Sequence, residues 1–271
     1  MTIRRWGVAT LAAALLFVPG LTACGQTEGS EPGSQGTGSG SVPADPKEAL
    51  LASTKEIAKG NFRFTMKGQE LDGEGLVHLP SRSAQMKMNA GDAELGFSMN
   101  LDLIYIEPDS WVKIQIEGAE GLPGLEKLNT GKYQHLDPSK IKDNDDLSFD
   151  FEDVDPAGTE ILTKAIVDVQ KTGEGAYSGN LDLTKATDAG MVDEEAIKTL
   201  GADAGKVPFE AKLDAQGRLS SLTIKMPAAG EAKAHELVVT YTDYGAATGA
   251  KKPADSEVVE APAETYDLFN S

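Results

Sequence analysis

The chain has 271 residues, with 43 acidic against 25 basic side chains and a formal net charge of −18. This charge repels phosphate backbones, so the composition argues against nucleic acid as a partner. Its single cysteine cannot form an internal disulfide or a thiolate metal cluster, and we expect no cofactor. With 40% hydrophobic residues, the chain is long enough to bury one sizeable core.

The first 23 residues are a predicted signal peptide. Arg4 and Arg5 precede an uncharged run over 6–20, which is shorter than the roughly 20 residues that cross a bilayer as a helix. The following Leu21-Thr22-Ala23-Cys24 resembles the lipobox of bacterial lipoproteins, in which the cysteine receives a lipid and becomes the first residue. We therefore expect Cys24 to anchor the protein in the cell membrane, on its extracytoplasmic face.

Two alternatives stand beside this interpretation. Cys24 as a buried thiol of the folded body would require the only cysteine to fall by chance at the end of a signal peptide. The pair of arginines leaves twin-arginine export open beside ordinary secretion.

Residues 24–45 are a predicted tether. Gly, Ser, Thr, Gln, Glu and Pro dominate this segment, and such a composition cannot bury enough apolar surface to become ordered. As a flexible coil, about twenty residues span roughly 25 Å, which places the body just off the membrane.

The body is predicted to begin with a helix. Asp45, Pro46 and Glu48 supply an N-cap, a proline at the first helical position and an acidic residue in the first turn. Apolar residues recur on one side until Gly60, where we expect the helix to end.

After Gly60 the apolar period changes to two, which is typical of half-buried antiparallel strands. The alternating positions are Phe62, Phe64, Met66, Met86, Met88, Leu95, Phe97, Met99, Leu101 and Leu103. Because 93–106 is long for one strand and Ile104 breaks the alternation, we expect a bulge or turn near 100–102. Residues 107–110 predict a hairpin turn before a strand over 111–116.

The middle of the chain has weaker signals. Between Gly118 and Asp155 we expect an ordered loop with short helical pieces. Asp155-Pro156 then predicts a second helix, whose apolar stripe extends to Val169. A strand over 176–183 and a third helix over about 192–200 follow.

Three further strands, 208–213, 218–226 and 236–244, are predicted to form a meander. From 245 onward the Ala-, Pro- and acid-rich composition predicts an extended tail, and we assign 251–271 as a tail outside a body of 46–250. Because helices and strands are segregated along the chain, the predicted fold is α+β, with a curved antiparallel sheet wrapped around helices on one face.

The sequence contains no convincing catalytic or metal motif. The three histidines lack ligand spacing, and the acidic run over 143–155 fails as an EF-hand because Ser148 stands where glycine is needed. Ser139-x-x-Lys142 matches a motif of penicillin-binding enzymes, but its companion motif precedes the serine instead of following it. We therefore expect neither a metal site nor an enzyme.

Methionines concentrate in the early strands. Four of the six in the mature chain lie within 34 residues: Met66, Met86, Met88 and Met99. They share strand faces with Phe64 and Phe97, and methionine offers a flexible, polarisable surface to flexible hydrophobic ligands. We therefore take these six residues as candidate ligand-binding residues. The alternative is an ordinary core beneath the helices.

Several segments resemble actinobacterial lipoproteins of the LppX/LprAFG type. They are the lipobox, the tether, the helix before Phe62-Arg63-Phe64, and residues 103–111, 177–182, 213–219 and 239–245. The resemblance spans roughly 46–250. It implies the fold of the lipoprotein carrier LolA, a strongly curved half-barrel with helices in its concave face, and lipid binding between sheet and helices.

Two functions remain open at this point. The first is a non-enzymatic, membrane-anchored lipoprotein that binds or carries a hydrophobic ligand between sheet and helices. The second is an envelope interaction or sensor lipoprotein with a filled core and no ligand. An apolar pocket of several hundred Å³ would favour the first, and a tightly packed interior the second.

Overall fold

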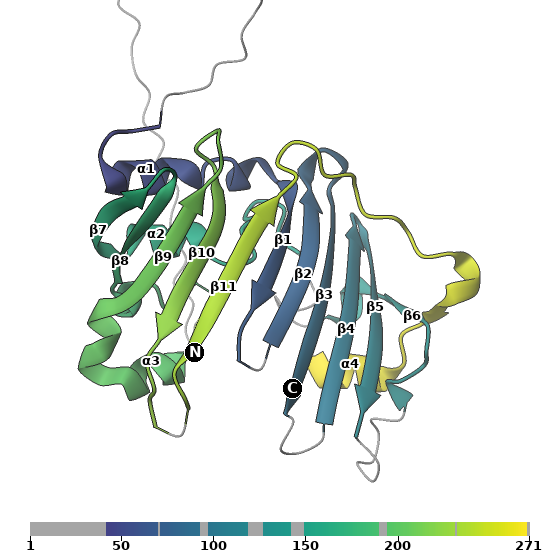
Figure 1. Ribbon diagram of the computed structural model, residues 1–271. Helices are drawn as coiled ribbons and strands as arrows, with labels where there is room; N and C mark the ends of the chain where they lie inside the picture. The colour runs from purple at the N-terminus through teal and green to yellow at the C-terminus, as the bar shows by residue number, and fades with distance from the viewer. Residues whose placement is uncertain are drawn as a thin grey trace, which may run out of the picture. The chain divides into compact units, whose positions relative to one another are not determined.

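The computed structural model describes residues 42–69, 71–92, 97–118, 127–141, 149–189, 194–230 and 232–269. Its main feature is one curved sheet of twelve strands, ordered β12-β6-β5-β4-β3-β2-β1-β11-β10-β9-β8-β7 (Figure 1). Neighbouring strands are antiparallel except β12 and β6, which are parallel. Helices pack on one face of this sheet, so the predicted α+β half-barrel is confirmed.

The strands have the following bounds: β1 Asn61–Lys67, β2 Leu71–His78, β3 Ser83–Asp92, β4 Phe97–Ile106, β5 Asp109–Glu117, β6 Tyr133–Leu136, β7 Ile166–Gly173, β8 Ala176–Leu181, β9 Val207–Leu213, β10 Leu219–Met226, β11 His235–Thr242 and β12 Val258–Glu260. The α-helices are α1 Pro46–Ser53, α2 Thr159–Lys164, α3 Glu194–Leu200 and α4 Ala263–Phe269.

Helix α1 begins where its capping residues predict. The Asp45 side chain accepts a hydrogen bond from the Glu48 backbone N–H, and Pro46 occupies the first turn. The helix ends at Ser53, earlier than predicted, and a short 3-10 turn over Ile57–Lys59 continues to Gly60. Gly60 has a φ of 58°, the left-handed conformation that glycine adopts without strain.

Strand β4 is continuous, so the bulge or turn predicted near 100–102 is wrong. Its register to β3 and β5 is regular from end to end. Ile104 breaks the alternation because it points to the outer face, opposite the helices, where it is buried and lies opposite the buried Trp111 of β5. Apolar residues thus occur on both faces of this part of the sheet, and a single-face pattern could not describe it.

The second predicted helix is also wrong in its extent. Helix α2 covers only Thr159–Lys164, and the expected apolar stripe continues as strand β7, which pairs with β8. Ile166, Val167 and Val169 are β-branched and fit a pleated strand better than a helix. The predicted third helix and the β9–β10–β11 meander are confirmed, with shifts of one or two residues at their ends.

The described part of the predicted tail, 251–269, is not an extended segment separate from the body. Strand β12 pairs with β6, and helix α4 buries Thr265 and Tyr266. The loop expected between 118 and 155 likewise contains strand β6, which supplies the partner for β12. The composition of the tail gave no sign of this, because a three-residue strand is too short for a periodic pattern.

The predicted signal peptide, Cys24 and nearly all of the tether lie outside the described residues. Within the described residues, no helix is both long enough and apolar enough to cross a membrane.

Candidate hydrophobic ligand site

The inner face of the sheet, against which the helices pack, holds two separate hydrophobic clusters. The first lies over β1 and β8–β11 and includes Leu50 of α1, Leu162 of α2 and Phe209 of β9. The second lies over β3–β6 and includes Leu103 of β4 and Tyr266 of α4. Strand β2 runs between the two groups of strands, so it marks a seam between the clusters.

The predicted methionines lie along this seam. The strand register places Met66, Gly73, Met88 and Leu101 side by side in one row across β1–β4. The neighbouring row contains Phe64, Gly75, Met86 and Leu103. We call the half-buried methionines Met66, Met86, Met88 and Met99 the methionine seam.

Two glycines form the middle of the seam. A Cβ atom at Gly75 would lie 2.6 Å from Cζ of Phe64, and one at Gly73 would lie 3.3 Å from Cε of Met66. The two side chains from β1 therefore pack directly onto the backbone of β2. Strand β2 presents no side chain to the inner face at these two positions, and the side chain that it does contribute to the first cluster is Val77, nearer its end. The absence of apolar side chains at the two glycines is also why the alternating pattern did not reveal β2 as a strand.

The six candidate ligand-binding residues have different environments. Phe64 is 2% exposed and packs edge-to-face with Phe62, so it belongs to the core. Met66 and Met86 are half-buried against the first cluster, whereas Met88 and Met99 are half-buried against the second. The side chain of Phe97 lies outside the described residues. The structure thus brings the four methionines together at the junction of the clusters.

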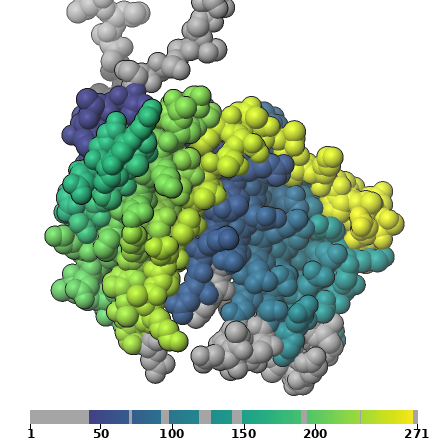
Figure 2. Space-filling model, in the orientation of Figure 1, coloured from purple at the N-terminus to yellow at the C-terminus, as the bar shows by residue number. Residues whose placement is uncertain are grey.

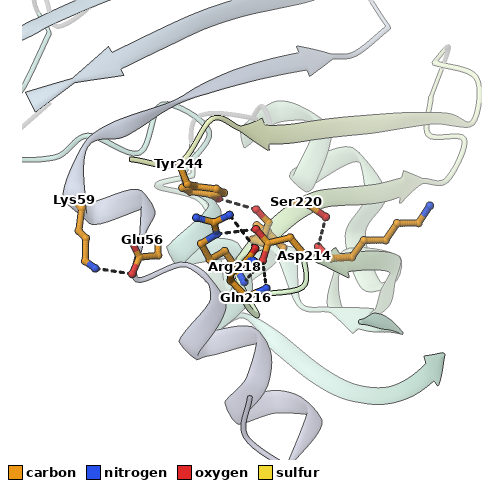
Figure 3. A network of polar contacts seen from close by, with 9 residues as sticks. Glu56, Lys59, Asp214, Gln216, Arg218, Ser220 and Tyr244 are labelled. Carbon is orange, nitrogen blue, oxygen red and sulfur yellow. Dashed lines mark hydrogen bonds and ion pairs between the residues drawn. The ribbon is translucent and has the colours of Figure 1, made fainter. Parts of the chain in front are cut away.

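At one end the first cluster is closed by a polar network (Figure 3). Arg218 donates from Nε to Oδ2 of Asp214 at 2.7 Å, and its guanidinium lies 4.9 Å from the centre of the Tyr244 ring. The Tyr244 hydroxyl donates to the backbone carbonyl of Leu219 at 2.7 Å, and burial raises the pKa of this phenol. These contacts hold the β9–β10 turn against the aromatic residues of the core. We therefore assign these contacts a structural role. The methionines of the seam, by contrast, are only half-buried.

A second polar group is buried inside the first cluster. The Tyr241 hydroxyl donates to Oδ1 of Asp155 at 3.0 Å and lies 2.5 Å from the Thr159 hydroxyl. Burial raises the pKa values of both Asp155 and Tyr241. Sequence reasoning used Asp155 only as a helix start and missed its long-range partner, because the two residues are 86 positions apart and no local pattern signals their pairing.

The histidines and acidic side chains of the described residues were the candidates for metal binding. No group of three or more His, Cys, Asp or Glu side chains there could hold a metal ion. His78 contacts Ser81, His235 contacts the Lys233 carbonyl, and His135 lies between Asp109 and Glu260. The three histidines therefore have separate local partners.

Comparison with known proteins adds no assignment. No family model matches the chain, and no curated protein matches it.

Proposed function

We propose that this protein is a lipid-anchored lipoprotein of the cell envelope that binds an acyl chain or a similar hydrophobic ligand at the methionine seam. The observation that carries the proposal is the position of four half-buried methionines between two otherwise closed hydrophobic clusters. The unbranched thioether side chain of methionine can change its conformation to fit ligands of different shape more easily than the branched side chains of valine, isoleucine or leucine can. The proposal includes membership of the LppX/LprAFG type and assigns no catalytic step.

The burial of Phe64 favours a second candidate function. A fully packed phenylalanine at the edge of the seam is what a filled core would contain, and this agrees with an interaction or sensor lipoprotein that has no ligand. The two functions differ in one measurable property, which is whether the seam accepts added bulk.

Replacing Met88 by Trp tests this property. If the seam accommodates a ligand, the indole occupies that space, so binding of a fluorescent fatty-acid probe weakens and the free energy of unfolding changes little. In a filled core, the same substitution costs about 1–3 kcal/mol through overpacking. Probe titration and urea unfolding of the same variant provide both measurements.

Met226→Leu is the matched control, because Met226 is buried in the first cluster on β10, away from the seam. It should leave probe binding unchanged and cost less than about 1.5 kcal/mol. Absence of probe binding by the wild-type chain, together with destabilisation of Met88→Trp, would reject the carrier and support the filled core.

The anchor is tested separately at Cys24. Cys24→Ala removes the thiol that accepts the lipid, so incorporation of a fatty-acid analogue should be abolished and the chain should partition into the aqueous phase of a detergent extraction. Cys24→Ser provides a control that keeps the size of the side chain. Labelling that persists in both variants would contradict the assignment of the anchor.

A further inference from the structure

A trough crosses the outer face of the sheet; polar and charged side chains line most of it, and Met66, Met88 and Leu101 lie in its lining as well. It has a volume of about 510 Å³ and is lined by residues of β1 to β6. A smaller hollow of about 210 Å³ adjoins it toward β11 and shares Thr65, Glu74 and Lys87 with it. Figure 2 shows this surface hollowed between β11 and the first strands of the sheet. The combined hollow is open and elongated across the strands, which suits a chain-like ligand.

The trough follows from the glycines of β2. Because Gly73 and Gly75 have no side chains, Phe64 and Met66 pack directly against the inner side of this strand. Both glycines also contribute to the lining of the hollows on the outer side. The same two residues therefore shape the seam on one face and the trough on the other.

The charges in the trough balance. Six charged side chains line it: Lys67, Lys87, Lys113, Asp72, Glu74 and Asp102. Along one row the sign alternates from strand to strand, because Glu74 is opposite Lys87, and Asp102 is opposite Lys113. This local neutrality contrasts with the net charge of −18 of the whole chain. A charged polymer would meet a repulsive side chain at every second strand.

Hydrogen bonds hold the polar groups of the trough in fixed orientations. Asp102 accepts from Nε2 of Gln85 at 2.9 Å and from the hydroxyl of Tyr133 at 2.7 Å. Nδ2 of Asn89 donates to Oδ1 of Asn100 at 2.5 Å. Groups that are already ordered lose less conformational entropy when a ligand binds. Each amide and carboxylate also keeps unused donors or acceptors that can face a ligand.

We propose that this trough binds a neutral oligosaccharide. A sugar hydroxyl both donates and accepts hydrogen bonds, so it can pair with carboxylates, amides and ammonium groups that alternate over short distances. An uncharged chain also avoids the repulsion that an anionic or cationic polymer would meet. An extended peptide would instead gain its main-chain hydrogen bonds at a free sheet edge, and the trough lies on a face. Met66 and Met88 of the seam also contribute to the trough lining, so the two proposed sites are neighbours, but the saccharide site does not depend on a ligand at the seam.

Calorimetric titration of the full chain tests the site. The probes are neutral hexasaccharides of glucose, mannose and N-acetylglucosamine, with uncharged hexapeptides of Gly and Ser for comparison. At least one saccharide should bind with a Kd of about 1 mM or below, and the peptides should not bind. Asn100→Ala and Gln115→Ala, each removing one hydrogen-bonding side chain from the trough, should weaken binding about two- to tenfold.

Glu210→Gln is the matched control, because Glu210 lies on the outer face in β9, outside the trough, and forms an ion pair with Lys225. It should leave saccharide affinity unchanged. Gln115 is exposed and its substitution leaves the core intact, so a loss of binding in that variant reports on the site and not on folding. Failure of every saccharide to bind, equal binding by the trough variants, or binding of peptides alone would overturn the proposal.

Discussion

Asp155 shows how a single side chain connects a local turn to the core. Its Oδ2 accepts a hydrogen bond from the Glu160 backbone N–H at 2.8 Å, which caps the start of α2, while Oδ1 accepts from Tyr241 on β11. Burial raises the pKa of this carboxyl, and the two hydrogen bonds oppose that effect. Burial therefore raises the free energy of the ionised carboxylate in the folded state, and this effect is absent in the unfolded chain.

The raised pKa of Asp155 predicts a pH dependence of stability. The folded state binds this proton more tightly than the unfolded state, whose pKa is near the ordinary 3.8. The contribution of Asp155 to the free energy of unfolding is thus fully present below that value and decreases as the pH rises through the folded-state pKa. In Asp155→Asn this dependence should disappear. The wild type should therefore lose stability relative to the variant as the pH increases.

Urea unfolding of both proteins between about pH 3 and pH 7 measures this difference. Carboxylates with lowered pKa values, such as Asp182 and Glu210, act in the opposite direction but are common to both proteins, so they cancel. Parallel stability curves over this pH range would contradict the prediction.

At the scale of elements, the C-terminal segment closes the second cluster. Helix α4 buries the ring of Tyr266, whose hydroxyl accepts a hydrogen bond from the Asp137 backbone N–H at 2.9 Å. The Thr265 hydroxyl donates to the buried Gln134 side chain, and the Ala261 backbone N–H donates to the His135 carbonyl. A segment whose composition suggests a tail is therefore part of the folded body.

Tyr266→Ala tests the contribution of this helix. Loss of a buried aromatic ring leaves a cavity, so the free energy of unfolding should fall by about 3–5 kcal/mol. Tyr266→Phe keeps the ring and removes only the hydroxyl, at a cost of about 1 kcal/mol. Equal and small effects in chemical denaturation of the two variants would show that α4 is not docked in solution.

At the scale of the whole molecule, the twelve strands form one sheet, but its inner face buries two clusters instead of one. All described residues belong to one compact unit that begins at Gly40, so most of the predicted tether precedes it.

Deleting Gly33–Gly40 tests whether the tether is only a spacer. Since a disordered segment contributes no packed contact, the thermal midpoint should stay within about one degree of that of the intact chain. A substitution at the start of the body, Asp45→Ala, serves as a positive control, because loss of the N-cap of α1 should cost about 1 kcal/mol. A clear drop in the midpoint on deletion would show that the segment docks on the fold.

The amino-acid sequence by itself determined the elements whose signals are local. Asp45 and Pro46 identify the start of α1, and the alternation in β1, β4 and β9–β11 identifies those strands, because capping and pleat depend on residues a few positions apart. The local pattern also selected the methionines that lie at the seam. These signals sufficed for the α+β half-barrel.

Only the tertiary structure decided how distant segments combine. Gly73 and Gly75 interrupt the apolar alternation, so the sequence did not predict β2. The segment forms a strand because it pairs with β1 and β3 on either side. Phe64 and Met66 occupy equivalent positions in the alternating pattern of β1, so the sequence placed them in one group. In the structure Phe64 is buried against Phe62 and the backbone of β2, whereas Met66 is only half-buried. Strand β12 forms because it pairs with β6, which lies more than a hundred residues earlier in the chain. Helix α4 is held in place because Tyr266 packs into the second cluster. Such long-range contacts stabilise segments whose own sequence is too short or too polar to specify their structure.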